Sequence, residues 1–261
     1  MTSSPRVRLP LAYRLCVVIA KAAAVPLMRR DWRGAEHLDR PGGIIVCPNH
    51  ISHVDFIATA HFLYDNGRPP FYLAKSTLFE IPVVGRLLKA ARQIPVHRNT
   101  GRAADAYREA VSRVQQGATV PLYPEGTITR DPGVWPMTAK TGAARIALET
   151  RCPVIPLAQW GAQEIMPPYS GRLRLFPIKT MHLLAGPPVD LDDLYDRPVT
   201  AEVLREATDR IMAAIIVQLE ELRGEKAPVE RYDLRQHQGD QSGKPGQHRT
   251  VRPDHRGEDG R

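Results

Sequence analysis

The chain has 261 residues, of which 43% are hydrophobic and 25% are charged, and this ordinary globular composition excludes a fibre or a wholly disordered chain. Its three cysteines, Cys16, Cys47 and Cys152, are too few for a disulfide framework and do not have the spacing of metal ligands. The formal net charge is +8, and +6 of it lies in residues 1–33. A general nucleic-acid binder needs a broad basic stripe, so this distribution instead favours contact of one end with an anionic membrane surface.

Residues 9–28 form the longest apolar run, but Arg14 and Lys21 interrupt it. A membrane-spanning helix needs about 20 nearly uncharged residues, and the core of a signal peptide does not contain lysine. The pattern predicts an interfacial helix whose cations reach the lipid headgroups, with a helix packed on the protein's own core as the alternative. We therefore expect residues 1–33 to be a basic, amphipathic, membrane-associated segment of a peripheral or monotopic protein at the cytoplasmic face of the cell membrane.

Apolar periodicity predicts alternating strands and helices between residues 43 and 222. The expected strands are 43–47, 71–74, 94–97, 118–123, 153–160, 173–177 and 181–186, and the expected helices are 55–63, 83–92, 105–116, 140–150 and 201–222. Thr200 is the expected N-cap of the last helix. This alternation predicts a single α/β domain over residues 34–223, with a mostly parallel or mixed central sheet flanked by helices.

From residue 224 onward, apolar residues nearly vanish, and Gly, Pro, Gln, His and mixed charges dominate. Such a segment cannot bury enough apolar surface to offset the entropy lost on ordering. We therefore expect a disordered polar tail over residues 224–261.

The first candidate site lies in the run NHISHVD (49–55), directly after a predicted strand. A carboxylate that binds one imidazole nitrogen fixes the tautomer and leaves the other nitrogen free to take a proton from a hydroxyl. Asp55 can do this for His50 if His50 lies outside the helix and Asp55 lies in its first turn. The pattern thus predicts a His50–Asp55 pair that acts as a general base.

Two alternatives stay open for this run. The spacing of Ser52 and Asp55 also matches a helix capping box, in which Asp55 would be structural. His53, in the turn before the helix, is a second candidate base. The spacing of one histidine and one aspartate is by itself a weak signal, because chance alone often produces it.

The second candidate site is the run Tyr123-Pro124-Glu125-Gly126-Thr127, again at a strand end. Glycine lets the backbone approach a ligand closely, and amides with a threonine hydroxyl can bind phosphate oxygens. Arg130 and Lys140 are the nearest cations that follow it. An ordinary turn is the alternative.

A third signal is Arg98, which ends the run IPVHR (94–98) beside a predicted loop and suits bidentate phosphate binding, although a lone arginine is more often a solvated surface residue. All three motifs follow predicted strands of one α/β chain. Because open α/β sheets bind ligands at the carboxyl ends of their strands, we expect the three to form one site.

These motifs, in this order, resemble the four sequence blocks of the glycerophospholipid acyltransferases of the 1-acylglycerol-3-phosphate acyltransferase type, over roughly residues 40–190. The matching positions are Asn49, His50 and Asp55 for the NHxxxxD block, Arg98 for the second, Pro124, Glu125, Gly126 and Thr127 for the third, and Val154, Ile155 and Pro156 for the fourth. The resemblance implies that the histidine is a general base, that the aspartate is its partner, and that the second and third blocks bind the glycerophosphate. It also implies an acyl thioester donor, carried by CoA or acyl carrier protein, and neither metal nor cofactor.

One position departs from the family pattern. Many members have Arg directly after Glu-Gly-Thr, where this chain has Ile128, and Arg130 lies two residues further on. The phosphate contact would then be made by Arg130, or by Arg98 and Lys140.

The resemblance therefore implies acyl transfer to the free hydroxyl of lysophosphatidate, giving phosphatidic acid, without a serine or cysteine nucleophile. No Gly-x-Ser-x-Gly elbow surrounds Ser52, and Cys47 lies in a buried strand. The alternatives are another acceptor (glycerol 3-phosphate, another lysophospholipid or a glycolipid), or a membrane-surface binding module with an inactive site.

Overall fold

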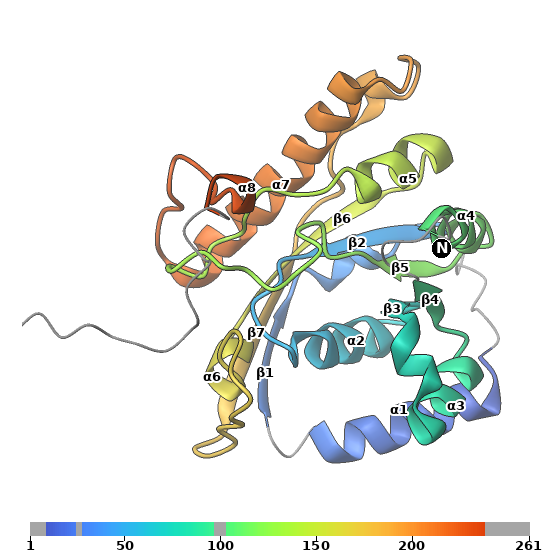
Figure 1. The fold of residues 1–261 in the computed structure, drawn as a ribbon, viewed down its shortest axis with the longest axis vertical. Helices are drawn as coiled ribbons and strands as arrows, with labels where there is room; N and C mark the ends of the chain where they lie inside the picture. Colours follow the sequence, from blue (N-terminus) through green and yellow to red (C-terminus); the bar gives the residue numbers. More distant parts are fainter. Residues whose placement is uncertain (1–8, 25–27, 97–102, 238–261) are drawn as a thin grey trace, which may run out of the picture.

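The computed structural model describes residues 9–24, 28–96 and 103–237, and its centre is a five-stranded sheet in the order β1-β7-β6-β2-β5 (Figure 1). The strands are β1 (Met28–Arg33), β2 (Ile44–Pro48), β5 (Thr119–Pro121), β6 (Val154–Trp160) and β7 (Lys179–Ala185). Neighbouring strands run parallel except for β6 and β7, which are antiparallel. The predicted α/β class with a mixed central sheet is therefore confirmed.

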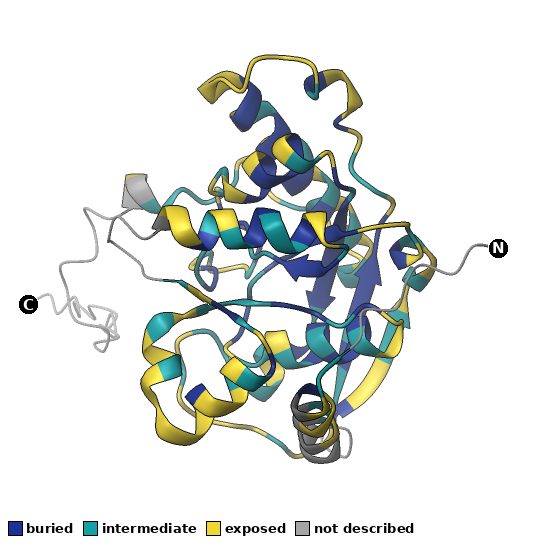
Figure 2. Ribbon diagram, turned by 90° about the vertical axis from the view of Figure 1, so that its right-hand side faces the viewer, coloured by how far each residue is buried: buried dark blue, intermediate teal, exposed yellow. Residues whose placement is uncertain are grey.

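Helices cover both faces of this sheet, which explains why β2 is apolar at successive positions rather than at alternate ones. Ile45 and Cys47 of β2 pack into a core with the helices α4 (Ala103–Gln115), α5 (Gly142–Thr150) and α7 (Ala201–Arg223). Ile44 and Val46 point to the other face, where α2 (Asp55–Asp65) packs. Figure 2 shows the buried strands in dark blue between more exposed helices. The sheet, packed on both faces, therefore fixes the positions of the loops that follow its strand ends.

A small second sheet lies beside the main one and pairs β3 (Leu73–Lys75) in parallel with β4 (Ile94–Val96). An isolated bridge between Pro70 and Thr119 ties it to β5. The connection between β3 and β4 carries the helix α3 (Pro82–Ala90). Short helical segments complete the chain: η2 (Ala35–Leu38), η3 (Ser76–Glu80), α6 (Ala162–Ile165), η4 (Asp192–Leu194) and α8 (Leu234–His237).

Two predicted features of the sheet are wrong. Residues 28–33, expected to belong to the N-terminal segment, form the edge strand β1 of the main sheet. Their charges conceal the strand in the sequence, because an edge strand tolerates charged side chains that face solvent. Conversely, residues 173–177 alternate like a strand but form an irregular, largely exposed connection between α6 and β7.

The N-terminal helix α1 (Leu11–Ala24) has one side on the domain and another in solvent. The buried Tyr13 donates its hydroxyl to Pro70 O at 2.9 Å, and its ring lies against Phe71. Leu11, Leu15 and Val18 are exposed. Within the described ranges, no helix has the length and apolar character that crossing a membrane requires.

At the other end, α7 begins as predicted, because Thr200 Oγ1 accepts the backbone N–H of Val203 at 3.2 Å. In place of the disorder expected from residue 224, residues 224–237 are placed against the domain. Thr138 N donates to Tyr232 O at 3.0 Å, and Arg231 pairs with Asp209. The rest of the predicted tail, 238–261, lies outside the described residues.

Candidate active site

The NHISHVD and PEGT motifs meet where the parallel strands β2 and β5 end, and the end of β6 lies beside them. Three hydrogen bonds join Asn49, after β2, to Gln159 near the end of β6. Asn49 Nδ2 donates to Gln159 O (3.1 Å), Gln159 N donates to Asn49 Oδ1 (2.8 Å), and Gln159 Nε2 donates to Asn49 O (2.5 Å). Both side chains are fully buried, so these bonds hold the residue before His50 in one position.

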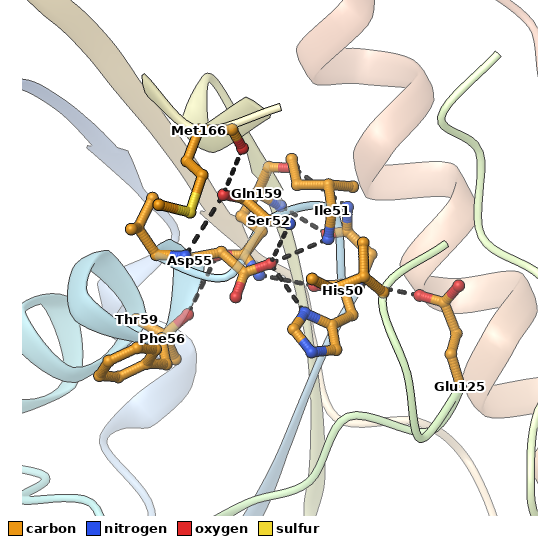
Figure 3. Close-up of polar contacts among 12 residues, drawn as sticks. His50, Ile51, Ser52, Asp55, Phe56, Thr59, Glu125, Gln159 and Met166 are labelled. Carbon is orange, nitrogen blue, oxygen red and sulfur yellow. Dashed lines mark hydrogen bonds and ion pairs between the residues drawn. The ribbon is translucent and has the colours of Figure 1, made fainter. Parts of the chain in front are cut away.

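His50 and Asp55 form the predicted pair, as Figure 3 shows. Asp55 Oδ2 lies 3.0 Å from His50 Nδ1. The Asp55 side chain is completely buried, whereas that of His50 is 22% exposed. A proton on Nδ1 that faces the carboxylate leaves Nε2 without its proton and able to accept one. The geometry is that of an oriented base beside solvent.

The capping box expected as an alternative for residues 49–55 forms only in part. Asp55 Oδ2 also accepts the backbone N–H groups of Ile51 (2.8 Å) and Ser52 (3.0 Å), as a capping carboxylate would. Ser52 Oγ, however, donates to Met166 O at 2.7 Å. Asp55 thus organises the turn and orients His50 at the same time, while His53 is exposed on the turn.

Glu125 links the PEGT motif to His50. Its Oε1 accepts the backbone N–H of His50 and its Oε2 that of Met137, each at 2.9 Å, and the residue is 2% exposed. Burial raises the pKa of the Glu125 carboxyl to about 8, while the two amide donors lower this pKa. Both oxygens of Glu125 therefore hold backbone inside the protein, one at His50 and one at Met137.

The aromatic ring of Tyr123 forms one wall of the site. Its centroid lies 4.4 Å from that of the His50 imidazole, with 36° between the planes. Behind them, Cys47 is fully buried, and burial raises the pKa of its thiol far above the usual range. A buried, protonated thiol is a poor nucleophile, so Cys47 belongs to the core beneath the site.

The predicted phosphate-binding residues are brought together in part. Gly126 has φ +71°, and the end of the Lys140 side chain lies 3.1 Å from the position that a Cβ on Gly126 would take. Thr127 is half-buried and Ile128 is buried. The guanidinium of Arg130 lies over the ring of Tyr169, with 5.3 Å between guanidinium carbon and centroid. Arg98 lies outside the described residues.

The sequence interpretation did not single out Gln159. Its side chain also accepts a hydrogen bond from Thr59 Oγ1 at 3.2 Å, which connects β6 to α2. The available signal was a glutamine inside the otherwise apolar run VIPLAQW, since a buried amide must find partners.

Comparison with known proteins identifies relatives of this arrangement. The model of the acyltransferase family matches residues 29–160, just over half of the chain. The chain is 31% identical over 152 residues to a chloroplastic 1-acyl-sn-glycerol-3-phosphate acyltransferase of Brassica napus, an alignment that covers 57% of this chain and 42% of that protein. A Bacillus subtilis protein of the same printed activity is 29% identical over 62% of this chain and 75% of its own length.

Among solved structures, the 1-acyl-sn-glycerophosphate acyltransferase of Thermotoga maritima shares the fold, with a TM-score of 0.60 at 24% identity over 83% of this chain and 81% of that chain. The chain spans less than half the length of several curated relatives that it matches, such as those from Brassica napus and Borreliella burgdorferi. The family match includes β2, the His50–Asp55 pair, the Glu125 bridge and β6. The chain belongs to the acyltransferase family.

Proposed function

We propose that this protein transfers a fatty acyl group from an acyl thioester, carried by CoA or acyl carrier protein, to the free hydroxyl of 1-acylglycerol-3-phosphate, giving phosphatidic acid. The observation that carries the proposal is the buried Asp55 carboxylate 3.0 Å from Nδ1 of a partly exposed His50. The relatives from Brassica napus and Bacillus subtilis, whose names state this activity, support the choice of acceptor.

The reaction needs one general base. His50 Nε2 takes the proton of the acceptor hydroxyl while the hydroxyl oxygen forms a bond to the carbonyl carbon of the thioester. The tetrahedral intermediate collapses, the C–S bond breaks, and the thiolate leaves with the proton that the imidazole held. Asp55 keeps the imidazole in the productive tautomer and stabilises its charged form while the proton is on it. General-base assistance of this kind contributes roughly 10²–10⁴ in rate.

The acceptor phosphate would bind beside this base. We assign it to the Gly126–Thr127 backbone and hydroxyl, to Lys140 above them, and to Arg98 and Arg130. Lys140 supports this assignment, because its amine lies against Gly126 and brings a positive charge to the turn. Glu125 contributes by holding His50 and the loop that contains Met137.

For the domain organisation, we propose a membrane-associated N-terminal segment that ends before β1, an acyltransferase domain that begins with β1, and a polar tail. Anionic lipid is the proposed partner of the N-terminal segment, and the cytoplasmic face of the cell membrane its location. The three exposed apolar residues of α1 support this reading, as do the four cations of residues 1–27, a stretch whose sequence contains no aspartate or glutamate.

The direct test is an acceptor panel with one labelled acyl-CoA, in which thiol release and labelled product are both measured. Thiol release that depends on lysophosphatidate, with labelled phosphatidic acid as the product, is the expected result. Faster transfer to glycerol 3-phosphate or to an unphosphorylated glycolipid would contradict the proposed acceptor. If the folded protein showed no activity with any acceptor, the result would favour a membrane-surface binding module with an inactive site.

A further inference from the structure

The connection between α6 and β7 exposes three large apolar side chains to solvent. In residues 171–178, here called the 171–178 loop, Leu173 is 56% exposed, Phe176 is 77% exposed and Ile178 is 42% exposed. The sequence pattern there resembles a strand, yet no strand forms and the side chains do not turn into a core. Large apolar side chains gathered on one exposed loop indicate a contact with something outside the chain.

The charges around this loop point to the kind of partner. Arg172 and Arg174 are exposed, and Lys179 follows at the start of β7. From residue 165 to residue 189 the sequence contains no aspartate or glutamate. Apolar side chains flanked only by cations match an anionic lipid surface, in which the rings and aliphatic groups enter the acyl region and the arginines reach the headgroups.

The base of the loop is attached to the candidate active site. Tyr169 donates its hydroxyl to Ile128 O at 2.6 Å, and its ring lies under the guanidinium of Arg130. Met166 O accepts the hydroxyl of Ser52, which lies between His50 and Asp55. A surface that holds the tip of this loop would therefore also hold the mouth of the site at a defined distance.

The same end of the molecule carries other apolar surface. Figure 1, whose vertical direction is the longest axis, places the 171–178 loop, α1 and α3 at its lower end. Exposed on the two helices are Leu11, Leu15 and Val18 of α1, and Val83, Val84 and Leu87 of α3. Separate patches at one end of the long axis suit a lipid surface better than a single protein partner, which meets one continuous patch.

We propose that the 171–178 loop is a second membrane contact, distinct from the N-terminal helix, which inserts Leu173 and Phe176 into an anionic bilayer and so places the site opening at the lipid surface. The proposal deepens the proposed function and rests on it, because an amphiphilic acceptor in a bilayer must reach His50 from that surface. Its partner is the lipid surface, and a second copy of the chain or another protein is the contrary outcome.

The first experiment is sedimentation of the full chain with vesicles of phosphatidylcholine alone or mixed with phosphatidylglycerol. The double variant Leu173→Ser/Phe176→Ser should bind the mixed vesicles at least about tenfold more weakly than the wild type, because two apolar side chains no longer enter the lipid. The matched control is Val217→Ser/Val229→Ser, which removes two exposed apolar side chains from α7 and the segment after it and should bind like the wild type. Wild-type affinity in the first variant would overturn the proposal.

The charge contribution is tested by Arg172→Gln/Arg174→Gln. Each cation near an anionic surface is worth about a fivefold change in affinity, so binding to the mixed vesicles should weaken and binding to phosphatidylcholine alone should change little. Arg108→Gln/Arg145→Gln, on the exposed sides of α4 and α5, is the control. Equal weakening by both pairs would show a general charge effect and would contradict a specific loop contact.

Insertion can be observed without removing any apolar group. In Phe176→Trp, the added tryptophan should be quenched by brominated lipid, relative to the wild type, if the loop enters the bilayer. An unquenched tryptophan on bound protein, or a loop variant that loses self-association rather than vesicle binding, would overturn the proposal. Transfer to a water-soluble, short-chain acceptor separates the two hypotheses: if the wild type lacks this activity, the proposed function fails, while the vesicle and quenching results still decide the role of the loop.

Discussion

A carboxyl oxygen of Glu125 accepts the backbone N–H of His50 at 2.9 Å, so the PEGT turn holds His50 by its main chain. The other oxygen of Glu125 holds Met137, and Thr129 N donates to His50 O at 2.8 Å. His50 is thereby fixed on its N–H and C=O sides by the segment that follows β5, and on its imidazole by Asp55. Pre-organisation of this kind matters because a small displacement of a base lowers the reaction rate strongly.

Replacement of His50 by alanine should reduce transfer at least ~10²-fold, because general-base assistance is lost and the fold retains its buried contacts. Labelled product formation measures the effect, and circular dichroism checks the fold. His53→Ala is the matched control, since His53 is exposed on the same turn, and it should remain active. A His50→Ala enzyme that kept more than about a tenth of wild-type turnover would refute the assignment of the base.

Glu125→Gln should change how stability depends on pH. Because burial raises the pKa of Glu125 to about 8, the folded protein keeps a proton that the unfolded chain releases near 4.5. The stability contributed by this proton is complete below about pH 4.5 and is lost as the pH rises toward 8. Between about pH 5 and pH 8, the free energy of unfolding of the wild type should therefore fall, by at most about 1.4 kcal/mol per pH unit.

The Glu125→Gln variant lacks this titration and should show a flatter pH profile in urea unfolding. At pH 5 it should be less stable than the wild type by about 1–3 kcal/mol, because the amide nitrogen of glutamine cannot accept a backbone N–H, whereas both oxygens of the carboxyl can. The exposed Glu164→Gln should keep the wild-type slope. Parallel slopes for the wild type and Glu125→Gln would show that the carboxyl is ionised throughout.

Gln159→Leu should weaken the connection between β6 and β2. The leucine keeps the backbone N–H bond to Asn49 but loses the side-chain bonds to Asn49 O and from Thr59, so a loss of stability of about 1–3 kcal/mol is expected. Because Asn49 precedes His50, kcat should fall more than the acceptor KM rises. The exposed Gln116→Leu is the control, and an unchanged kcat in Gln159→Leu would assign the amide a purely structural role.

Arg98→Ala should raise the acceptor KM and leave the hydrolysis of acyl-CoA by water little changed, because the arginine is assigned to the phosphate and not to the thioester. Initial rates with lysophosphatidate and with a phosphate-free acceptor measure the two effects. The exposed Arg108→Ala should leave both unchanged. Equal loss against both acceptors would argue against phosphate binding by Arg98.

Truncation tests whether the N-terminal segment binds the membrane, and the structure limits how many residues can be removed. A deletion must end by residue 24, because Met28 begins a strand of the central sheet. The shortened protein should bind anionic vesicles more weakly and use long-chain acceptors in bilayers less well, while a short-chain, water-soluble acceptor is used about equally. Wild-type binding should also weaken with salt, because surface charges are screened beyond ~10 Å at 0.1 M. Undiminished, salt-independent vesicle binding by the shortened protein would place the membrane contact elsewhere.

Local signals in the sequence determined much of the architecture. The apolar runs that became β2 and β6, the amphipathic pattern of α7 and the Thr200 cap follow from periodicity and capping, which act within a few residues. The position of the two main motifs after strands placed them at one edge of the sheet, because parallel strands end on the same side. The pairing of His50 with Asp55 was also predictable, because the two residues are five positions apart and their contact depends on a single turn.

Only the tertiary structure decided the partners that are distant in the sequence. Residues 28–33 become a strand because β7, about 150 residues later, offers an edge, and residues 173–177 do not become one although they alternate. Glu125 reaches the His50 backbone across 75 positions, and Gln159 reaches Asn49 across 110. A buried polar group needs a hydrogen-bond partner, and the tertiary structure decides which group lies beside it. The spacing of residues in the sequence does not identify that partner.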